Sequence, residues 1–334
     1  MKPFFTRTTQ IGIVVKDLKA TMKTYVEKYG IGPWEVFKFS KENVADLQIG
    51  GKPADYSMVL AMCNIGNTQW ELIEQISDNS DYAKFLKEHG EGIHHIAVGP
   101  DSKKEFYEFC ESNNLKSIMK GDWLGANGTI FTYDYIDTID DLKLIAELHA
   151  PDENFIGDAP LYTYPDGPMP REPVFTDVLQ IGIICRDLDK TCKTYTEKYG
   201  LGPWKVYEFN NKTVQDLSVG GVRQDYAMDL ALAQFGNVQW ELIQPLDEIS
   251  DYAKFLREQG EGVHHMALET KDYNEAKEFC DKLNIKQVQY GYWGSNFHYD
   301  YRDTRDDMKC IVELYGPEPS FEWPEPVRVY SVAD

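Results

Sequence analysis

Histidine is scarce in this sequence, and positive charge is in deficit. The 334 residues include 7 histidines, and 34 Lys and Arg stand against 55 Asp and Glu, for a formal net charge of −21. This balance argues against binding to a nucleic-acid backbone, which needs clustered Lys and Arg, and against an anionic membrane surface. An anionic small molecule remains possible, because a pocket can be locally positive. We therefore expect a small-molecule substrate, and neither nucleic acid nor membrane as a partner.

Long apolar runs and paired cysteines are also lacking. No run is long enough to span a bilayer, and the opening stretch MKPFFTRTTQ has no apolar signal-peptide core, so we expect a cytoplasmic protein. The six cysteines form neither a CxxC pair nor a secreted disulfide framework. Cys110 and Cys280 occupy equivalent places in two expected helices, which indicates small buried apolar residues.

What the sequence does contain is an internal duplication. TQIGIVVKDLKATMKTYVEKYGIGPWEVF (9–37) returns as LQIGIICRDLDKTCKTYTEKYGLGPWKVY (179–207), and the run ending in GEGIHHIAV returns with GEGVHHMAL. Equivalent residues are 170 positions apart as far as the histidines, and 166 apart later, where FTYDYIDT matches FHYDYRDT. The Pro-rich stretch 164–175 has the composition of a linker, so we expect one domain over 1–163 and another over 176–334.

Each half has a further internal rhythm. QIGIVV alternates and is β-branched, as in a strand, and the helix that follows should begin at Asp17 and end at Gly30. More strands end at TQWELIEQ, the helix SDYAKFLKEHG follows, and GIHHIAV starts a second series of strand, helix and strands. The chain therefore holds four such units, two in each half.

Each unit places a polar residue on its first strand and a glutamate on its last. If the two units of a half pack as pseudo-twofold partners, these four side chains can converge. Oxygen and nitrogen donors of this kind suit Zn²⁺, or Mn²⁺, Co²⁺ or Ni²⁺, and two carboxylates offset the charge of the ion. The expected metal ligands are Gln10, Glu71, His95 and Glu147 in one half and Gln180, Glu241, His265 and Glu313 in the other.

The paired histidines cannot both face one site, because neighbouring residues on a strand point to opposite faces. QIGIV and HIAV occupy the same place in their units, so His95 and His265 are the counterparts of Gln10 and Gln180. We expect His94 and His264 to pack or to form a backbone hydrogen bond.

The ELIEQ…DYAKFLKEHGEGIHHIA run and the later YxDT…AEL pattern resemble the vicinal oxygen chelate (glyoxalase/bleomycin resistance) superfamily, and within it the methylmalonyl-CoA epimerase-like proteins. The resemblance implies an α+β fold of four βαβββ modules, arranged as two paired-module domains. It also implies metal ligands on the first and last strand of each module, at the eight positions named above. The epimerase-like pattern usually has His where this chain has Gln10 and Gln180, whereas zinc-type glyoxalase I enzymes resemble the present set.

The resemblance further implies an isomerase or epimerase that removes a proton next to a metal-bound carbonyl or carboxylate of a small acid or acyl thioester. Glu147 and Glu313 are the expected bases, with Glu71 and Glu241 second. Two alternatives stay open: a glyoxalase-like lyase or other metal-assisted carbon–carbon or ring chemistry, and a non-catalytic protein that sequesters a small ligand. Related epimerases are dimers of a two-unit chain, so this chain resembles a covalent pseudo-dimer, either monomeric or further associated. Weaker candidates for substrate contact are Asp55, Asp225, Trp123 and Trp293.

Overall fold

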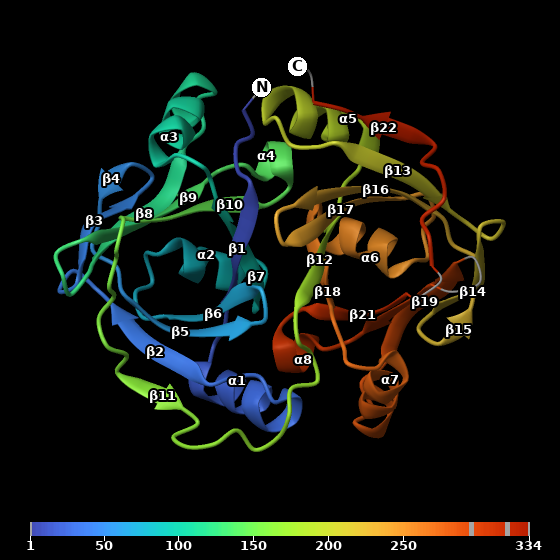
Figure 1. The fold of residues 1–334 in the computed structure, drawn as a ribbon, viewed down its shortest axis with the longest axis horizontal. Helices are drawn as coiled ribbons and strands as arrows, with labels where there is room; N and C mark the ends of the chain where they lie inside the picture. Colours follow the sequence, from blue (N-terminus) through green and yellow to red (C-terminus); the bar gives the residue numbers. More distant parts are fainter. Residues whose placement is uncertain (1, 294–296, 318–320, 333–334) are drawn as a thin grey trace. The chain divides into compact units, whose positions relative to one another are not determined.

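The computed structural model describes residues 2–293, 297–317 and 321–332. The chain forms two compact units, one made of Pro3–Asp140 with Leu144–Pro173 and the other of Val174–Asp334 with Met1–Lys2 and Asp141–Lys143. Each unit is built around an 11-stranded mixed sheet with short helices (Figure 1). The predicted α+β class is confirmed, as are the repeated modules.

The N-terminal half contributes the following elements in order: β1 (Arg7–Val14), α1 (Leu18–Thr24), the π-helical turn η1 (Tyr25–Tyr29), β2 (Trp34–Phe39), β3 (Val44–Ile49), β4 (Lys52–Pro53), β5 (Met58–Ile65), β6 (Thr68–Gln75), α2 (Asp81–Glu88), β7 (Gly92–Gly99), α3 (Lys103–Ser112), β8 (Ser117–Leu124), β9 (Ile130–Ile136), α4 (Ile139–Leu142), β10 (Ile145–Pro151) and β11 (Tyr162–Tyr164). The strand order in its sheet is β11-β2-β5-β6-β1-β7-β10-β9-β8-β3-β4.

The C-terminal half repeats this series: β12 (Val178–Ile184), α5 (Leu188–Lys193), the π-helical turn η2 (Thr194–Lys198), β13 (Trp204–Phe209), β14 (Val214–Val219), β15 (Val222–Arg223), β16 (Met228–Phe235), β17 (Val238–Pro245), α6 (Asp251–Glu258), β18 (Gly262–Leu268), α7 (Tyr273–Lys282), β19 (Gln287–Trp293), β20 (Phe297–Arg302), α8 (Arg305–Met308), β21 (Ile311–Pro317) and β22 (Arg328–Tyr330). Its sheet follows the same plan, β15-β14-β19-β20-β21-β18-β12-β17-β16-β13-β22.

The first strands of two modules meet at the middle of each sheet. β1 runs antiparallel to β7, while each of them pairs in parallel with the last strand of its own module, β6 and β10. The four strands that carry the expected ligands are therefore consecutive neighbours, β6-β1-β7-β10, and β17-β12-β18-β21 in the other unit.

The first module of each half contains a hairpin that the plain βαβββ pattern does not include. β3 and β4 pair with each other, and β3 also pairs with β8 of the second module. The hairpin β14–β15 repeats this arrangement against β19. Each sheet is thereby extended by strands that pass from one module to the other.

Local sequence signals act as expected at the helix ends. The Asp17 carboxylate accepts from the backbone N–H of Ala20 at 2.9 Å, and Gly30 closes the helical segment at φ 70°, a left-handed conformation that suits glycine. Ser80 caps α2 in the same way. Tyr164, the first residue of the expected linker, still belongs to β11, which pairs with β2. The boundaries at 163 and 176 stay predictions about which segments fold independently.

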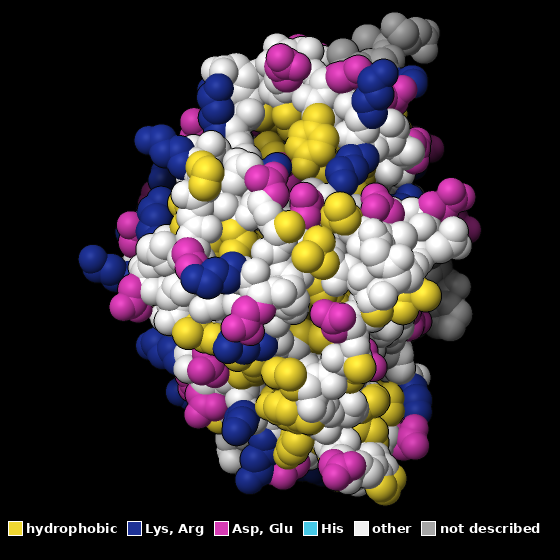
Figure 2. Space-filling view, turned by 90° about the vertical axis from the view of Figure 1, so that its left-hand side faces the viewer, with side chains coloured by type: hydrophobic (Ala, Val, Ile, Leu, Met, Phe, Trp, Pro, Cys, Tyr) yellow, Lys and Arg dark blue, Asp and Glu magenta, His cyan; other side chains and the backbone are white. Residues whose placement is uncertain are grey.

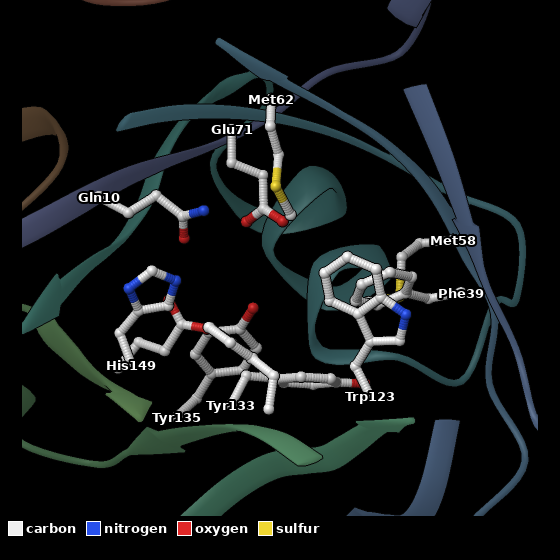
Figure 3. Close-up of a pocket in the computed structure, with 11 residues that line it drawn as sticks. Gln10, Phe39, Met58, Met62, Glu71, Trp123, Tyr133, Tyr135 and His149 are labelled. Atoms are coloured by element: carbon white, nitrogen blue, oxygen red, sulfur yellow. The ribbon is translucent and has the colours of Figure 1, made fainter. Parts of the chain in front are cut away.

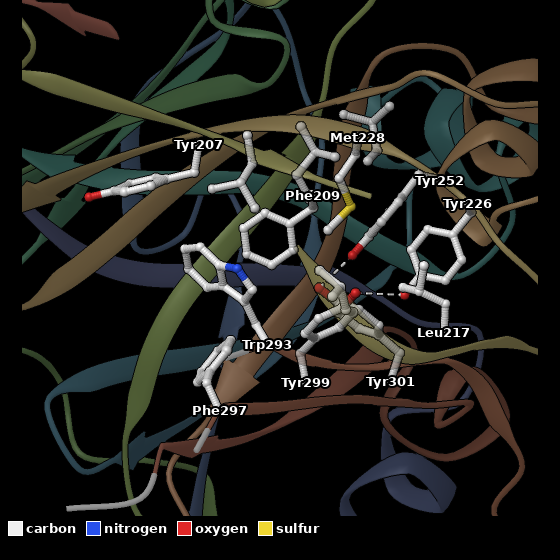
Figure 4. Packing of buried hydrophobic residues seen from close by; sticks show 14 of the residues in the cluster. Tyr207, Phe209, Leu217, Tyr226, Met228, Tyr252, Trp293, Phe297, Tyr299 and Tyr301 are labelled. Carbon is white, nitrogen blue, oxygen red and sulfur yellow. Dashed lines mark hydrogen bonds between the residues drawn. The ribbon is translucent and has the colours of Figure 1, made fainter. Parts of the chain in front are cut away.

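Aromatic side chains dominate the interior of each sheet. In the C-terminal half, Tyr226 and Tyr252 donate hydrogen bonds to Tyr299 and Tyr301, inside a cluster that also holds Trp293 (Figure 4). All six cysteines are free and buried, which confirms the prediction for Cys110 and Cys280. On the face shown in Figure 2, basic and acidic side chains are interspersed. Within the described residues, no helix is both long and apolar enough to cross a membrane.

Candidate metal centre

The structure brings the four expected ligands of each half together. In the N-terminal half Gln10, Glu71, His95 and Glu147 are 2%, 5%, 1% and 3% exposed. Gln10 and Glu71 point into a hollow whose other wall carries Tyr135 (Figure 3). The C-terminal copies, Gln180, Glu241, His265 and Glu313, are equally buried.

Three donor atoms in each half face one another without hydrogen-bond partners. His95 Nε2 lies 3.1 Å from Glu147 Oε2 and 3.6 Å from Glu71 Oε2, and none of these atoms has a partner in hydrogen-bonding geometry. The corresponding distances from His265 Nε2 are 3.2 Å to Glu313 and 3.4 Å to Glu241, again without partners. A buried polar atom without a partner is costly, so a repeated triplet of such atoms indicates a missing ligand.

The spacing of these atoms fits a small divalent cation. With metal–ligand bonds of about 2.1 Å, two ligands stand roughly 3.0 Å apart at a right angle and roughly 3.4 Å apart on a tetrahedron. Three of the four observed separations, 3.1, 3.2 and 3.4 Å, lie between these values, and the fourth is 3.6 Å. Within the described part of the chain, no group of three or more His, Cys, Asp or Glu side chains meets the geometry of a preformed metal cluster. The fit rests on the unpartnered atoms and their spacing.

Gln10 is oriented by a residue that the sequence analysis overlooked. Its amide nitrogen donates to Gln69 Oε1 at 2.7 Å, and Gln180 does the same to Gln239 at 2.7 Å. The carbonyl oxygen is therefore the atom of Gln10 that can serve as a ligand. The glutamine of the repeated QWEL motif, two residues before Glu71 and Glu241, was the available signal.

Glycine on the first strand makes room for the ligand histidine. Gly12 is paired with His95 across β1 and β7, and a Cβ at Gly12 would lie 1.9 Å from His95 Cε1. Gly182 and His265 show the same 1.9 Å approach. A glycine inside a strand often marks such a close approach, so QIGI in both halves carried this information.

A β-bulge explains how adjacent histidines can touch. The register passes from Gly12–His95 to Ile13–Ile93, which leaves His94 as the extra residue. His94 Nδ1 then lies 3.1 Å from His95 Nδ1, and His94 Nε2 lies 3.0 Å from Asp81 Oδ2 on α2. His264, His265 and Asp251 repeat both distances. The predicted packing of His94 and His264 is confirmed, because both rings are buried against aromatic side chains. In place of the backbone hydrogen bond given as the alternative, their ring nitrogens contact side chains.

This chain of contacts leaves unprotonated the nitrogen of His95 that faces Glu71 and Glu147. The Asp81 carboxylate can only accept, so His94 Nε2 carries a proton and His94 Nδ1 accepts one from His95 Nδ1. Burial lowers the pKa of His94 to about 4, which keeps its ring neutral. The unprotonated His95 Nε2 is then available as a metal ligand, and hydrogen bonding of the second nitrogen is typical of metal-binding histidines.

Burial increases the affinity of the ligand carboxylates for protons. Loss of solvation raises the pKa of Glu71 and of Glu147 well above the usual range, and neighbouring carboxylates add to this effect. Burial likewise raises the pKa of Glu313. A group of buried acids held in this way needs protons or a cation.

The pKa values of the two ligand histidines are shifted in opposite directions from the usual value. Burial lowers the pKa of His95 to about 3. Burial acts on His265 in the same sense, but Glu241 and Glu313 outweigh it and raise the pKa to about 9. A cation bound at Nε2 would replace the proton of His265 and leave both rings neutral. The site is therefore defined by the geometry that the two halves share and not by the difference in histidine pKa.

The hollow beside the ligands is small in both halves. Its volume is about 20 Å³ in the N-terminal half and about 10 Å³ in the C-terminal half, enough for little more than one water or ion. Its walls are aromatic and apolar, and the described residues that line it include neither Lys nor Arg. Neither lysine nor arginine on this lining offsets the charge of the buried carboxylates, which leaves protons or a bound cation to do so.

The weaker sequence candidates are placed differently. Asp55 is exposed and pairs with Lys41 at 2.6 Å, and Asp225 is exposed and accepts from Asn211 at 2.7 Å, so neither is brought to the hollow. Trp123 lines the N-terminal hollow, while Trp293 lies in the aromatic cluster of the C-terminal half. His149, which the sequence analysis did not select, also lines the N-terminal hollow.

Comparison with solved structures found chains that are similar to this one. The structure is similar to that of a mutant 4-hydroxymandelate synthase from Streptomyces coelicolor, with a TM-score of 0.57 and 13% identity over 95% of this chain and 94% of that one. It also matches a methylmalonyl-CoA epimerase from Streptomyces coelicolor (TM-score 0.32, 24% identity, 43% of this chain and 96% of that one) and a hypothetical protein from Bacillus halodurans (0.32, 26%, 44% and 96%).

A comparison with curated proteins gave no match. The family model, however, matches the chain twice, over residues 9–133 and over residues 179–299, once in each half. The chain therefore belongs to the Glyoxalase/Bleomycin resistance protein/Dioxygenase superfamily.

Proposed function

We propose that the protein is a divalent-metal-dependent epimerase or isomerase that removes a proton from the carbon next to a carbonyl or carboxylate group. The observation that carries the proposal is the repeated set of buried, unpartnered donor atoms on Glu71, His95 and Glu147. Its substrate would be a small acid or an acyl thioester. Zn²⁺ fits the mixed oxygen and nitrogen donors, as do Mn²⁺, Co²⁺ and Ni²⁺.

Gln10, Glu71, His95 and Glu147 would hold the cation in the N-terminal half, and Gln180, Glu241, His265 and Glu313 would hold it in the other. Bound there, a divalent cation supplies Lewis-acid stabilisation of negative charge that develops on a substrate oxygen. The described residues that line the hollow include no Lys or Arg that could supply this stabilisation instead.

Glu147 is the residue that we propose as the base, with Glu71 second; Glu313 and Glu241 are their counterparts in the C-terminal half. Burial raises the pKa of Glu147, so its carboxylate has a stronger affinity for a proton than an exposed glutamate. A carboxylate oxygen that takes the proton would have to be one that does not hold the cation. Tyr133, Tyr135 and Trp123 wall the hollow and limit the access of water to the exchanging proton.

Metal content is the first test. Protein purified without added metal, then equilibrated with Zn²⁺, should contain about two equivalents, one for each ligand set. His95→Ala and His265→Ala should each retain about one equivalent, and the double variant should retain none. Absence of binding from Zn²⁺, Mn²⁺, Co²⁺ and Ni²⁺ would contradict the proposal and favour a non-catalytic ligand-binding protein.

Proton exchange is the second test. The metal-loaded protein would be incubated in deuterated water with 2-substituted acids, 2-oxo acids and 2-methyl-branched acyl thioesters, and loss of the proton signal at the 2-position followed by NMR. In the His265→Ala background, which retains only the N-terminal ligand set, Glu147→Gln should lower the exchange rate by about 100-fold or more while the remaining metal is retained. Exchange that is equally fast in Glu147→Gln would exclude Glu147 as the base. Turnover of a 2-oxoaldehyde thiol adduct without exchange into solvent would favour the glyoxalase-like alternative.

A further inference from the structure

The two halves share their donor atoms but differ at the mouth of the hollow. In the N-terminal half a second cavity of about 450 Å³ adjoins the inner hollow and shares four lining residues with it: Met62, Trp123, Phe131 and His149. Its outer wall is formed by the segment that includes Asp152 and Phe155. A volume of this size lies in the range of small-molecule sites.

In the C-terminal half, an indole ring occupies the corresponding place. The ring centroid of Trp323 lies 5.1 Å from that of Trp293, 5.7 Å from Phe297 and 5.2 Å from Phe321. By the repeat of the sequence, these three residues are the counterparts of Trp123, Phe131 and Phe155, which line the outer cavity of the N-terminal half. Trp323 is half-buried and also lines the inner hollow, so it covers the ligands from the solvent side.

The counterpart of Trp323 in the N-terminal half is Gly157. Gly157 packs against the edge of Trp123, where a Cβ would lie 2.5 Å from the indole ring. No side chain can extend from this position without displacing Trp123, and the outer cavity stays open. The same place in the fold thus carries the smallest residue in one half and the largest in the other.

The polar groups at the mouth differ as well. His149 of the N-terminal half, which lines both the inner hollow and the outer cavity, has Tyr315 as its counterpart in the C-terminal half. The ring of Tyr315 packs edge to face 4.8 Å from Phe297, as the ring of His149 does 4.5 Å from Phe131. The N-terminal mouth therefore carries an imidazole where the C-terminal mouth carries a phenol ring.

We propose that the two sites have different tasks: the N-terminal site binds the small-molecule substrate, and the C-terminal site holds its cation as a closed structural site beneath Trp323. Structural metal sites in proteins are closed, whereas catalytic ones keep a position open to substrate. The aromatic and methionine walls of the open cavity, together with His149 and Asn154, suit a small acid with an apolar or aromatic substituent. This inference rests on the proposed metal dependence.

Single-site proteins loaded with Co²⁺ allow the two sites to be compared directly. His265→Ala retains the N-terminal ligands, and His95→Ala retains the C-terminal ligands. Acetohydroxamate, a small chelating anion, would be titrated into each, with the visible absorption of Co²⁺ as the readout. The N-terminal site should respond with a dissociation constant at least about tenfold lower than that of the C-terminal site.

Removing the indole should open the closed site. Trp323→Gly, made in the His95→Ala background, reproduces the residue found in the other half and should make the C-terminal Co²⁺ respond to acetohydroxamate. Trp323→Phe in the same background keeps an aromatic cover and should stay unresponsive. An equal response of the two original single-site proteins, or no gain from Trp323→Gly, would overturn the division of tasks while the metal sites themselves stand. Failure of both single-site proteins to bind Co²⁺ would instead overturn the metal dependence and this inference with it.

Discussion

At the scale of single residues, the ligand histidine depends on two partners behind it. His95 is held by His94, and His94 is held by Asp81, through contacts of 3.1 Å and 3.0 Å. This arrangement extends the usual pattern, in which one carboxylate or carbonyl group orients a metal-binding histidine, by one additional ring. The identical distances around His264 and Asp251 show that the duplication preserved the whole chain of contacts.

Asp81→Asn should weaken metal binding without removing a ligand. An amide at this position can donate to His94 Nε2, which allows the opposite proton arrangement and leaves His95 Nε2 protonated. In the His265→Ala background, which retains only the N-terminal site, we expect Zn²⁺ affinity to fall by about 10- to 100-fold, the range for partners of metal ligands. Competition with a chromophoric chelator measures this, and ¹⁵N shifts of His95 report its tautomer.

The matched control is Asp55→Asn, which changes an exposed aspartate that pairs with Lys41. Its Zn²⁺ affinity should equal that of the parent protein. If Asp81→Asn bound Zn²⁺ as tightly as Asp55→Asn, and the His95 shifts were unchanged, the contact chain would have no role in presenting the ligand.

At the scale of elements, the central strands determine the site. β6, β1, β7 and β10 lie side by side, so residues far apart in sequence meet on one face of the sheet. The position of Gly12 opposite His95 is part of the same register, because the imidazole lies where a Cβ would otherwise be.

Gly12→Ala should therefore remove metal from the N-terminal site. Its Cβ would lie 1.9 Å from His95 Cε1 in the present structure, so the ring must move away from Glu71 and Glu147. We expect the loss of one metal equivalent and a destabilisation of about 1–3 kcal/mol, as for overpacking in a core. Metal analysis and chemical denaturation measure the two effects.

Gly182→Ala is the mirror variant and should remove the metal of the C-terminal site alone. Combining Gly12→Ala with His95→Ala separates the two effects, because the shortened side chain no longer meets the new methyl group. The stability cost of Gly12→Ala should then shrink. If both equivalents of metal survived in Gly12→Ala, the close approach would not be needed for binding.

Much of this arrangement could be predicted from the sequence because the same pattern of ligand residues occurs in both halves. Duplication separated Gln10, Glu71, His95 and Glu147 from ordinary strand residues, and the alternation of side chains along a strand selected His95 over His94. The bulge at His94 and the exchange of the β3–β4 hairpin onto β8 could not be predicted, since they depend on the pairing of distant strands. Asp55 and Asp225 were selected because they recur in both halves, but the buried residues of that repeat are the neighbouring Tyr56 and Tyr226, which bond to Tyr133 and Tyr299, and the aspartates face solvent.

At the scale of the whole molecule, the chain carries excess negative charge and buries part of it. The formal charge is −21, and four glutamates of the two ligand sets lie inside the sheets. Without a cation, burial raises the pKa of Glu71, Glu147 and Glu313. The metal-free folded protein therefore retains protons at pH values where the same groups of the unfolded chain have already released them. The contribution of these groups to stability is therefore present at low pH and is lost as pH rises through their raised folded pKa values.

Metal binding should reverse this dependence, because a cation takes the place of the retained protons. We expect Zn²⁺ to release protons on binding, measurable with a pH indicator in weak buffer, and to raise the melting temperature more at pH 8 than at pH 5. The double variant His95→Ala/His265→Ala provides the control, since its melting temperature should be insensitive to Zn²⁺ at both pH values. A Zn²⁺-induced rise that was equal at pH 5 and pH 8, with no proton release, would mean that the buried carboxylates are already ionised in the metal-free protein. The charge of the buried glutamates would then have to be balanced by groups other than the cation that we propose.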